Sequence, residues 1–447
     1  MRLPASGEET PHSARDLWTE VFVSWNIERA IRRVERNGGA PGIDGVTVSE
    51  LRSHWRIGWP AIKAALDAGT YRPAPVRRVE IPKPGGVRML GVPTVADRVI
   101  CQAIAQVLTP IFDPAFSEHS FGFRPNRSAH QAVNAARRLV EDGAGWVVDL
   151  DLAEFFDRIS HDMLMARVAR RVKDKRVLKL IRAYLNAGVM DAGVCVRTEE
   201  GSPQGSPLSP LLANVMLDDL DRELEKRGHR FVRYADDVTV YVASERAGQR
   251  VFEGICRFIE SKLKLRVNRD KSSVAPATRA HLLGFGLLKR KGNVGVRIDP
   301  KAKKRAKDRI RRLTARNWGV SMQRRIREIN DFIRGWTGYF ALADTPSFFD
   351  EFDEWLRRRL RQTRWKQWKR IRTKVRKLHS LGIPKQKAYE WANTRKGSWR
   401  IAGSAPLQRA MPNAYWQSLG LVGFTESYRR VRASLRTAGC GPACPVV

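Results

Sequence analysis

The stretch FVRYADDVTVYV, residues 231–242, constrains the fold most, because an acidic pair interrupts an otherwise apolar run. After the acids, valine occupies every second position, which is the period typical of a strand. We therefore expect two strands joined by a turn at or near Ala235 and Asp236. Two adjacent acids at a turn are either ordinary turn residues or metal ligands, and Asp236 and Asp237 alone leave both interpretations open.

A second apolar strand also ends in acids, in the stretch GWVVDLDLAEFFDRIS, residues 145–160. If this strand neighbours the first in one sheet, Asp151 and Asp236 converge on one place. Convergent carboxylates repel each other and need a cation, and Mg²⁺ prefers carboxylate, phosphate and water oxygens. Two such ions would activate a 3′-hydroxyl group and stabilise a leaving pyrophosphate, which is the two-metal route to phosphoryl transfer.

The charge of the chain points to nucleic acid as a partner. Its 447 residues carry 82 Lys and Arg against 46 Asp and Glu, a net charge of +36, which attracts polyanions. The hydrophobic share of 43% and the length favour a globular protein of two to three domains over a disordered tail. Residues 301–380 hold 25 basic against 8 acidic residues with helical spacing, which indicates a separate basic helical domain.

The cysteines and the N-terminus favour a cytoplasmic protein. Five cysteines, mostly within apolar runs, do not form a disulfide pattern, and we interpret Cys440 and Cys444 as part of a tail rather than a zinc site. The first residues lack the apolar core of a signal peptide, and we expect no stretch of membrane-spanning length and no membrane partner.

The order of the predicted elements indicates an α+β fold. Up to about residue 288, strands and helices mix without a regular strand–helix–strand repeat, which argues against a doubly wound sheet. We expect a helix from Leu17 to about Val34 and two strands around the turn in residues 76–93. Thr94 and Asp97 form a candidate capping box at the start of a further helix.

Several other side chains are ambiguous when read singly. Lys83 and Arg88 flank a glycine turn and are suited to gripping a triphosphate, but basic residues at a hairpin commonly face solvent. Gln204 lies in the loop SPQGSP, which either contacts a nucleotide or simply precedes a helix. Phe155 and Phe156 follow Asp151 closely, and they either pack in the core or contact a sugar.

Taken together and in order, these features resemble the reverse transcriptases, and within them the group II intron reverse transcriptase/maturases. The resemblance covers about residues 27–434. The blocks that carry it are GAPGIDGVTV, IPKPGGVRMLGVPTVADRV, HSFGFRPNRSAH, DLDLAEFFD, GSPQGSPLSPLLANVMLDDLD, RYADDV, LRVNRDKS and HLLGFG. The later stretch INDFIRGWTGYFALADTPSFFDEFDEWLRRRLRQTRWKQWKR is similar to the thumb, or maturase, domain of the family.

The resemblance implies a right-hand polymerase with an all-α domain behind it. Residues 1–16 are expected to be disordered, and residues 17–288 to form the fingers and palm with an N-terminal extension. Residues 289–378 are expected to form the helical thumb/maturase domain, and residues 379–447 a basic DNA-binding domain and tail. The final stretch GIPKQKAYEWANTRKGSWRIAGSAPLQRAMPNAYW is similar to the DNA-binding tail of the bacterial members without an endonuclease domain, often called class C.

The resemblance also implies a role for each matching residue. It assigns two Mg²⁺ ions to Asp151, Asp236 and Asp237, with a backbone carbonyl from Leu152, and it leaves Asp149 beside them as a supporting acid. Phe156 matches the aromatic gate that excludes a ribose 2′-hydroxyl. The remaining matches lie around the incoming nucleotide: Gln204 near its 3′-hydroxyl, Lys83 and Arg88 on its triphosphate, and Lys271 facing the same site.

The implied activity is that of an RNA-directed DNA polymerase that extends a primer on an RNA template. Its implied partners are deoxynucleoside triphosphates, a DNA primer, target DNA and a group II intron RNA, which it binds as a splicing and mobility cofactor. Two alternatives stay open at this stage. One is an RNA-binding maturase without polymerase activity, and the other is a domesticated relative that serves in defence or repair.

Overall fold

The computed structural model describes residues 16–437 with five short gaps, at 84–85, 192–193, 197–199, 202–204 and 291–292. The side chains of Lys83, Arg88, Arg290 and residues 191, 194–196 and 436–437 also lie outside the description. The chain divides into two compact units, Met1–Ala277 and Thr278–Val447. The predictions for residues 1–15 and for Cys440 and Cys444 fall outside the described residues.

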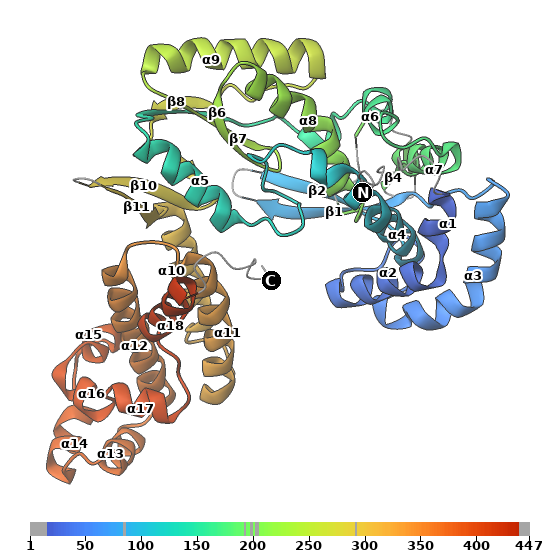
Figure 1. The fold of residues 1–447 in the computed structure, drawn as a ribbon. Coiled ribbons are helices and arrows are strands. Elements are labelled where there is room, and N and C mark those ends of the chain that lie inside the picture. Colours follow the sequence, from blue (N-terminus) through green and yellow to red (C-terminus); the bar gives the residue numbers. More distant parts are fainter. Residues whose placement is uncertain are drawn as a thin grey trace, which may run out of the picture. The chain divides into compact units, whose positions relative to one another are not determined.

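The first unit begins with helices α1 (Leu17–Phe22), α2 (Ser24–Asn37), α3 (Leu51–Asp67) and α4 (Val95–Phe112) (Figure 1). The single helix that we predicted from Leu17 is wrong, because Val23 is extended at ψ 142° and separates α1 from α2. A buried amide accounts for the break: the Asn26 side chain donates to the carbonyls of Val21 (2.8 Å) and Ala103 (3.2 Å), which ties the bend to α4.

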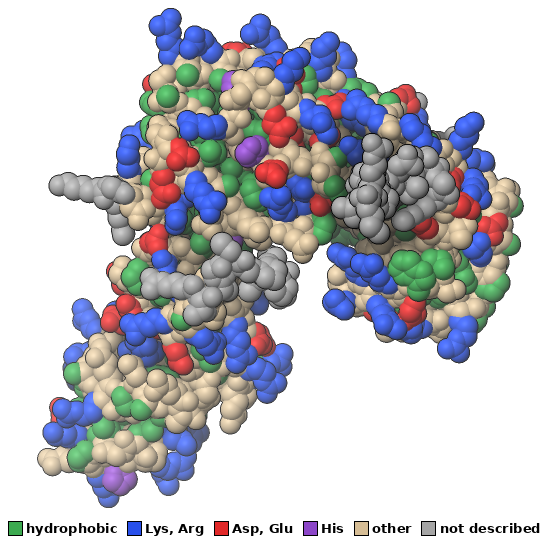
Figure 2. Space-filling view, viewed as in Figure 1, with side chains coloured by type: hydrophobic (Ala, Val, Ile, Leu, Met, Phe, Trp, Pro, Cys, Tyr) green, Lys and Arg blue, Asp and Glu red, His purple; other side chains and the backbone are tan. Residues whose placement is uncertain are grey.

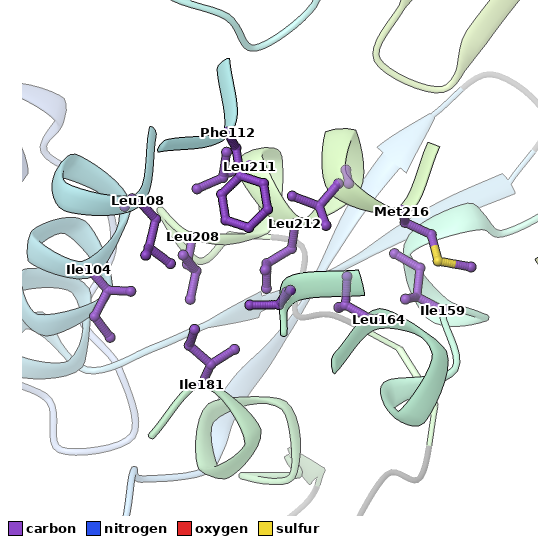
Figure 3. Packing of buried hydrophobic residues seen from close by; sticks show 14 of the residues in the cluster. Ile104, Leu108, Phe112, Ile159, Leu164, Ile181, Leu208, Leu211, Leu212 and Met216 are labelled. Carbon is purple, nitrogen blue, oxygen red and sulfur yellow. The ribbon is translucent and has the colours of Figure 1, made fainter. Parts of the chain in front are cut away.

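Helix α4 begins where the sequence predicts, after the cap Thr94, whose hydroxyl accepts from the Asp97 N–H at 3.1 Å. The segment Val95–Ala115 is long and apolar enough to cross a membrane, contrary to our expectation that no stretch reaches that length. However, 72% of this segment's apolar window is buried inside the protein. Ile104, Leu108 and Phe112 of α4 pack in the core, which explains the apolar composition (Figure 3).

A four-stranded sheet with the order β2-β1-β4-β5 follows the first helices. Its strands are β1 (Val76–Lys83), β2 (Gly86–Val92), β4 (Val189–Asp191) and β5 (Val194–Val196). The predicted hairpin is confirmed, because β1 and β2 pair antiparallel from Arg77 opposite Val92 to Lys83 opposite Gly86. Strand β4 adds in parallel on the other side of β1.

A second four-stranded sheet, with the order β6-β7-β3-β8, carries the acidic stretches. It consists of β3 (Trp146–Leu150), β6 (Arg230–Tyr234), β7 (Asp237–Val242) and β8 (Ser273–Pro276), all antiparallel. Helix α9 (Glu245–Phe258) packs on β3, β7 and β8. A Cβ atom on Gly248 of α9 would lie 2.5 Å from Val274 Cγ1, so this glycine permits the close approach of helix and sheet.

The remaining helices of the first unit complete its core. They are α5 (Ala129–Glu141), α6 (His161–Val168), α7 (Lys175–Leu185) and α8 (Ser209–Lys226), with the one-turn helix η4 (Phe155–Asp157). Figure 3 shows Leu211, Leu212 and Met216 of α8 packed with Leu164 and Ile181 from α6 and α7. These contacts bury one face of α8 in the core of the first unit.

The second unit is mostly helical. It opens with a three-stranded sheet of β9 (His281–Leu282), β10 (Phe285–Arg290) and β11 (Asn293–Ile298). Its helices are α10 (Pro300–Leu313), α11 (Met322–Phe340), α12 (Pro346–Gln367), α13 (Ile371–Ser380), α14 (Lys385–Ala392), α15 (Ser398–Ala402), α16 (Ala405–Ala410), α17 (Asn413–Ser418) and α18 (Phe424–Thr437).

An aromatic cluster joins the helices of the second unit. Trp336 of α11 contacts Phe349 and Phe352 of α12 and Phe424 of α18, with ring centroids 5.8 to 6.0 Å apart. The last helix is thus part of the same core as α11 and α12. Leu356, Leu360 and Trp368 are also buried in this unit, whereas Trp355 is partly exposed.

Candidate active site

The pairing of β3 with β7 brings the acidic stretches together. In the antiparallel register, Leu150 lies opposite Val238, so Asp151 follows β3 beside Asp237, the first residue of β7. Tyr234 pairs with Asp237 and leaves Ala235 and Asp236 as a two-residue turn. The two strands are neighbours, as the convergence of their acids requires.

The electrostatics of this sheet edge are dominated by negative charge. Asp149, opposite Thr239 in the register, is largely buried. Burial, reinforced by the negative charges of Asp237 and Asp151, raises the pKa of Asp149 to about 7. The carboxylates at this edge therefore repel one another, which is the condition under which they hold a metal cation.

Residues 266–272 hold Asp151 from the other side. Lys271 Nζ lies 3.7 Å from Asp151 Oδ2, so the predicted basic residue does face the acids. The Asp151 N–H donates to Ser272 Oγ at 3.0 Å, and its carbonyl accepts from the Asn268 N–H at 2.8 Å. Leu152 has a buried side chain and pairs with Val267 in an isolated bridge. The backbone after β3 is thereby fixed before any ligand binds.

The turn that carries Asp236 is tightly packed. Ala235 adopts φ +58°, a left-handed conformation that costs a residue other than glycine roughly 1–2 kcal/mol. Gly122 lies against this turn, where a Cβ atom would come within 2.2 Å of the Ala235 nitrogen. Only glycine allows this contact, so the 119–122 backbone braces the turn from one side.

A buried charged network braces the same turn from below. Arg233 is fully buried and donates two hydrogen bonds to the Asp221 carboxylate, at 2.7 and 2.5 Å. Its third nitrogen donates to Asn214 Oδ1 at 2.9 Å and to the Ala235 carbonyl at 3.0 Å. Asn214 in turn donates to the Gly122 carbonyl at 2.9 Å. Our sequence reasoning missed this network, although a charged residue inside an apolar strand was the signal for it.

The chemistry of the site fits a hard divalent cation, since its donors are aspartate oxygens at one sheet edge. Among the residues that the structure describes, no group of three or more His, Cys, Asp or Glu side chains is arranged to hold a metal ion. The strand register and the raised pKa of Asp149 indicate that the acids converge. Which of these acids coordinates a metal ion stays a prediction.

The structure describes the other predicted site residues to different extents. Phe156 is partly exposed in η4, with its ring edge-on to the buried Phe155 at a centroid distance of 5.1 Å. Lys83 and Arg88 lie on β1 and β2, but their side chains are outside the description. Gln204 lies outside the described residues altogether.

Comparison with known proteins agrees with this geometry. Residues 81–287 match the family described as reverse transcriptase (RNA-dependent DNA polymerase). Residues 303–382 match the maturase-specific domain of group II introns. The two matches divide the chain into a polymerase part and a maturase part.

Individual relatives extend the match. The chain is 30% identical to protein YkfC of Escherichia coli over 339 residues, which covers 66% of this chain and 89% of that protein. It is also 30% identical to the group II intron-encoded protein LtrA of Lactococcus lactis over 304 residues, but it spans only about half of LtrA, 51%. A putative COX1/OXI3 intron 1 protein of Saccharomyces cerevisiae is 26% identical over 321 residues, 59% of this chain and 38% of that protein. The chain belongs to the group II intron reverse transcriptase/maturases, a family of RNA-directed DNA polymerases.

Proposed function

We propose that this chain extends a DNA primer on an RNA template, with Asp151, Asp236 and Asp237 as the metal-binding acids. The observation that carries the proposal is the register of β3 and β7, which sets Asp151 beside the turn of the acidic pair. The pKa of Asp149, raised by burial and by the charge of its neighbours, supports it, because a cation would relieve exactly this crowding of charge.

The residues around the acids receive roles that suit their chemistry. When bound, two Mg²⁺ ions supply the charge that activates the primer 3′-hydroxyl and stabilises pyrophosphate. Lys271 holds the Asp151 carboxylate and lies where a triphosphate would gain a positive neighbour. The Leu152 carbonyl is a further candidate ligand. Lys83, Arg88 and Gln204 are assigned to the incoming deoxynucleotide by family resemblance.

The second unit is proposed to bind a group II intron RNA, which would make the chain a splicing and mobility cofactor. Lys and Arg side chains lie over the face of the unit that Figure 2 shows. Phosphate contacts from such side chains give affinity that falls steeply with salt. We assign the thumb/maturase function to residues 289–378 and binding of target DNA to residues 379–447. We infer that the protein acts in the bacterial cytoplasm.

The polymerase proposal is tested by primer extension on an annealed RNA template with deoxynucleotides and a Mg²⁺ titration. We compare the wild type with Asp151→Asn and with the control Asp142→Asn, an exposed residue at the end of α5. Wild type and control should extend the primer, whereas Asp151→Asn should lose about a hundredfold or more in rate. Equal rates for all three proteins would exclude Asp151 as a metal ligand.

The gate proposal concerns Phe156. Replacing this partly exposed ring with alanine removes the bulk that would clash with a 2′-hydroxyl, so the ratio of kcat/KM for deoxynucleotide over ribonucleotide should fall by about tenfold or more. The measurement is single-nucleotide incorporation with each substrate. An unchanged ratio together with a normal deoxynucleotide rate would remove this role from Phe156.

A further inference from the structure

A cavity of about 890 Å³ opens in the second unit along α12. One wall is formed by residues 351–361 in the middle of α12, and the opposite wall by residues at and after α15, in α16 and at the start of α17. Three arginines of α12 line it: Arg357, Arg358 and Arg361. This volume falls in the range of sites that hold a nucleotide-sized ligand.

Arg361 is the deepest of the three, with 7% of its surface exposed. Its Nε donates to the Ala402 carbonyl at 2.8 Å, while its two terminal nitrogens have no hydrogen bond among the described residues. Burial, together with the positive charges of Arg357 and Arg358, lowers the pKa of Arg361 to about 10. The base of the cavity is therefore short of negative charge.

One carboxylate of the same helix lies near enough to interact with this cluster, because the charge of Arg357 acts on the buried Asp353. Within the part of the chain that the structure describes, none of the three arginines has a carboxylate oxygen within 4.0 Å. Glu351 and Glu354 line the same cavity, but both are exposed and lie nearer the N-terminus of α12. The cavity thus has a cationic base and an acidic rim, and the base has room for an anion.

The arginines differ in how freely they can bind. Arg358 is fixed in place, because its guanidinium stacks 4.0 Å above the Trp399 ring and donates to the Trp399 carbonyl at 3.2 Å. Arg357 is half-buried and makes no hydrogen bond or ring contact among the described residues, although its charge acts on Asp353. The N–H groups of Arg357 are therefore available to hydrogen-bond a ligand.

We propose that this cavity binds a backbone phosphate of a nucleic-acid strand, with Arg357 and Arg361 as the donors. The planar fork of arginine matches phosphate oxygens in pairs. On the opposite wall, the amide groups of Gln408 and Asn413 can bond the sugar or base of the same nucleotide. This inference rests on the proposed function, since it names the place on the second unit where the strand is held.

The first test compares Arg357→Gln with Arg372→Gln. Arg372 is exposed on α13, outside the cavity, and its substitution removes the same charge. Binding of a fluorescent single-stranded RNA of about 30 nucleotides is measured by anisotropy at several salt concentrations in the full chain. Arg357→Gln should weaken binding about three- to tenfold and reduce the slope of log K against log[salt] by about 0.7, as for one lost phosphate contact.

Arg372→Gln should lower the affinity by no more than about twofold, because an exposed arginine adds to the general attraction of the domain for phosphate without a cavity to fix its geometry. Arg357→Lys should retain part of the affinity, because it keeps the charge but loses the paired geometry. Equal losses for Arg357→Gln and Arg372→Gln would overturn the site. Melting temperatures of all variants should match the wild type, since Arg357 makes no hydrogen bond among the described residues.

The second test places a probe in the cavity wall. The thiol introduced by Asn413→Cys, an exposed position, is alkylated by a neutral reagent, and the modified peptide is followed by mass spectrometry. Bound RNA should slow the alkylation, and inorganic phosphate should do so only at much higher concentration. If the RNA binds but does not slow the alkylation, the strand does not enter the cavity. Protection by phosphate alone would likewise contradict a nucleic-acid site.

These outcomes are separable from failure of the proposed function. If the wild type neither binds RNA nor extends a primer, the proposed function itself fails. If it does both and the Arg357→Gln and Arg372→Gln variants still behave alike, only the phosphate site fails.

Discussion

Two buried arginines show how differently the units of this protein use charge. In the first unit, Arg233 is completely buried and meets a carboxylate, an amide and a carbonyl, so its donors are consumed by the fold. In the second unit, Arg361 is nearly as buried, but among the described residues its one hydrogen bond is to the Ala402 carbonyl, beside two further arginines. A buried charge with a partner stabilises a conformation, whereas one without a partner indicates a place for a ligand.

Asp149 extends the comparison into the first unit. It is the acidic counterpart of Arg361, because burial, reinforced by neighbouring like charges, raises the pKa of Asp149 and lowers that of Arg361. Neither charge has an ion-pair partner within 4.0 Å among the described residues. In the first unit we expect a cation there, and in the second a phosphate.

The largest effect on stability is expected from breaking the paired arginine. Arg233→Leu leaves the Asp221 carboxylate buried without its partner, and it should lower the free energy of unfolding by about 3–5 kcal/mol. Urea unfolding followed by circular dichroism measures the change. The double variant Arg233→Leu/Asp221→Leu should recover much of the loss, because both charges are then absent. A single-variant cost below about 1 kcal/mol would contradict the network.

Replacing Asp149 should have a smaller effect on the free energy of unfolding, and this effect should depend on pH. The carboxyl titrates near pH 7 in the folded protein and near its ordinary value of about 3.9 in the unfolded chain, so the folded state binds the proton more tightly. The ionised form therefore destabilises the fold above pH 7, and this penalty disappears as the pH falls toward 4. Asp149→Asn should be more stable than the wild type by about 2–4 kcal/mol at pH 8 in EDTA, and the difference should shrink toward pH 4.

The check is a series of urea unfolding curves between pH 4 and pH 8, with Asp142→Asn as a control whose effect should not depend on pH in this way. Adding Mg²⁺ should reduce the difference in unfolding free energy between Asp149→Asn and the wild type at pH 8, because a bound cation stabilises the ionised wild type. A difference that stays constant with pH would show that Asp149 is not the buried acid that the geometry implies.

The smallest effect on the free energy of unfolding is expected from replacing Arg361, which has no carboxylate partner among the described residues. Arg361→Met loses the hydrogen bond to Ala402, but it also removes a buried charge without a carboxylate partner, so the free energy of unfolding should change by less than about 2 kcal/mol. In thermal unfolding, a polyanion should raise the Tm of the wild type more than that of Arg361→Met. If Arg361→Met lowered the free energy of unfolding as much as Arg233→Leu, the two arginines would not differ in how the fold uses them.

The sequence predicts what depends on local periodicity. The period of two in residues 145–152 and 237–242 located both strands, and the positions of Asp151 and Asp236 at their ends predicted where the acids would meet. Likewise, the basic helical spacing after Lys301 predicted the helical second unit, although its compact boundary at Ala277 lies ahead of the change in composition.

What the sequence could not show depends on partners distant in space. The break at Val23 follows from an amide that bonds α4, 77 residues further along the chain. The carboxylate of Asp97, expected to complete a capping box, accepts from the Thr94 hydroxyl at 2.7 Å and also from the hydroxyls of the distant Tyr71 (2.7 Å) and Tyr184 (3.0 Å). The sequence does not show that the arginines of α12 line a cavity, because the opposite wall is formed by residues from α15 to α17.

The central claim is that the turn between β6 and β7 carries a metal-binding acid, and one measurement tests it most directly. Primer extension on an RNA template is compared for the wild type and Asp236→Asn, with matched folding confirmed by circular dichroism and matched RNA binding by anisotropy. The account predicts that Asp236→Asn binds the primer and template normally but loses about a hundredfold or more in extension rate at saturating Mg²⁺. An extension rate equal to that of the wild type would contradict it.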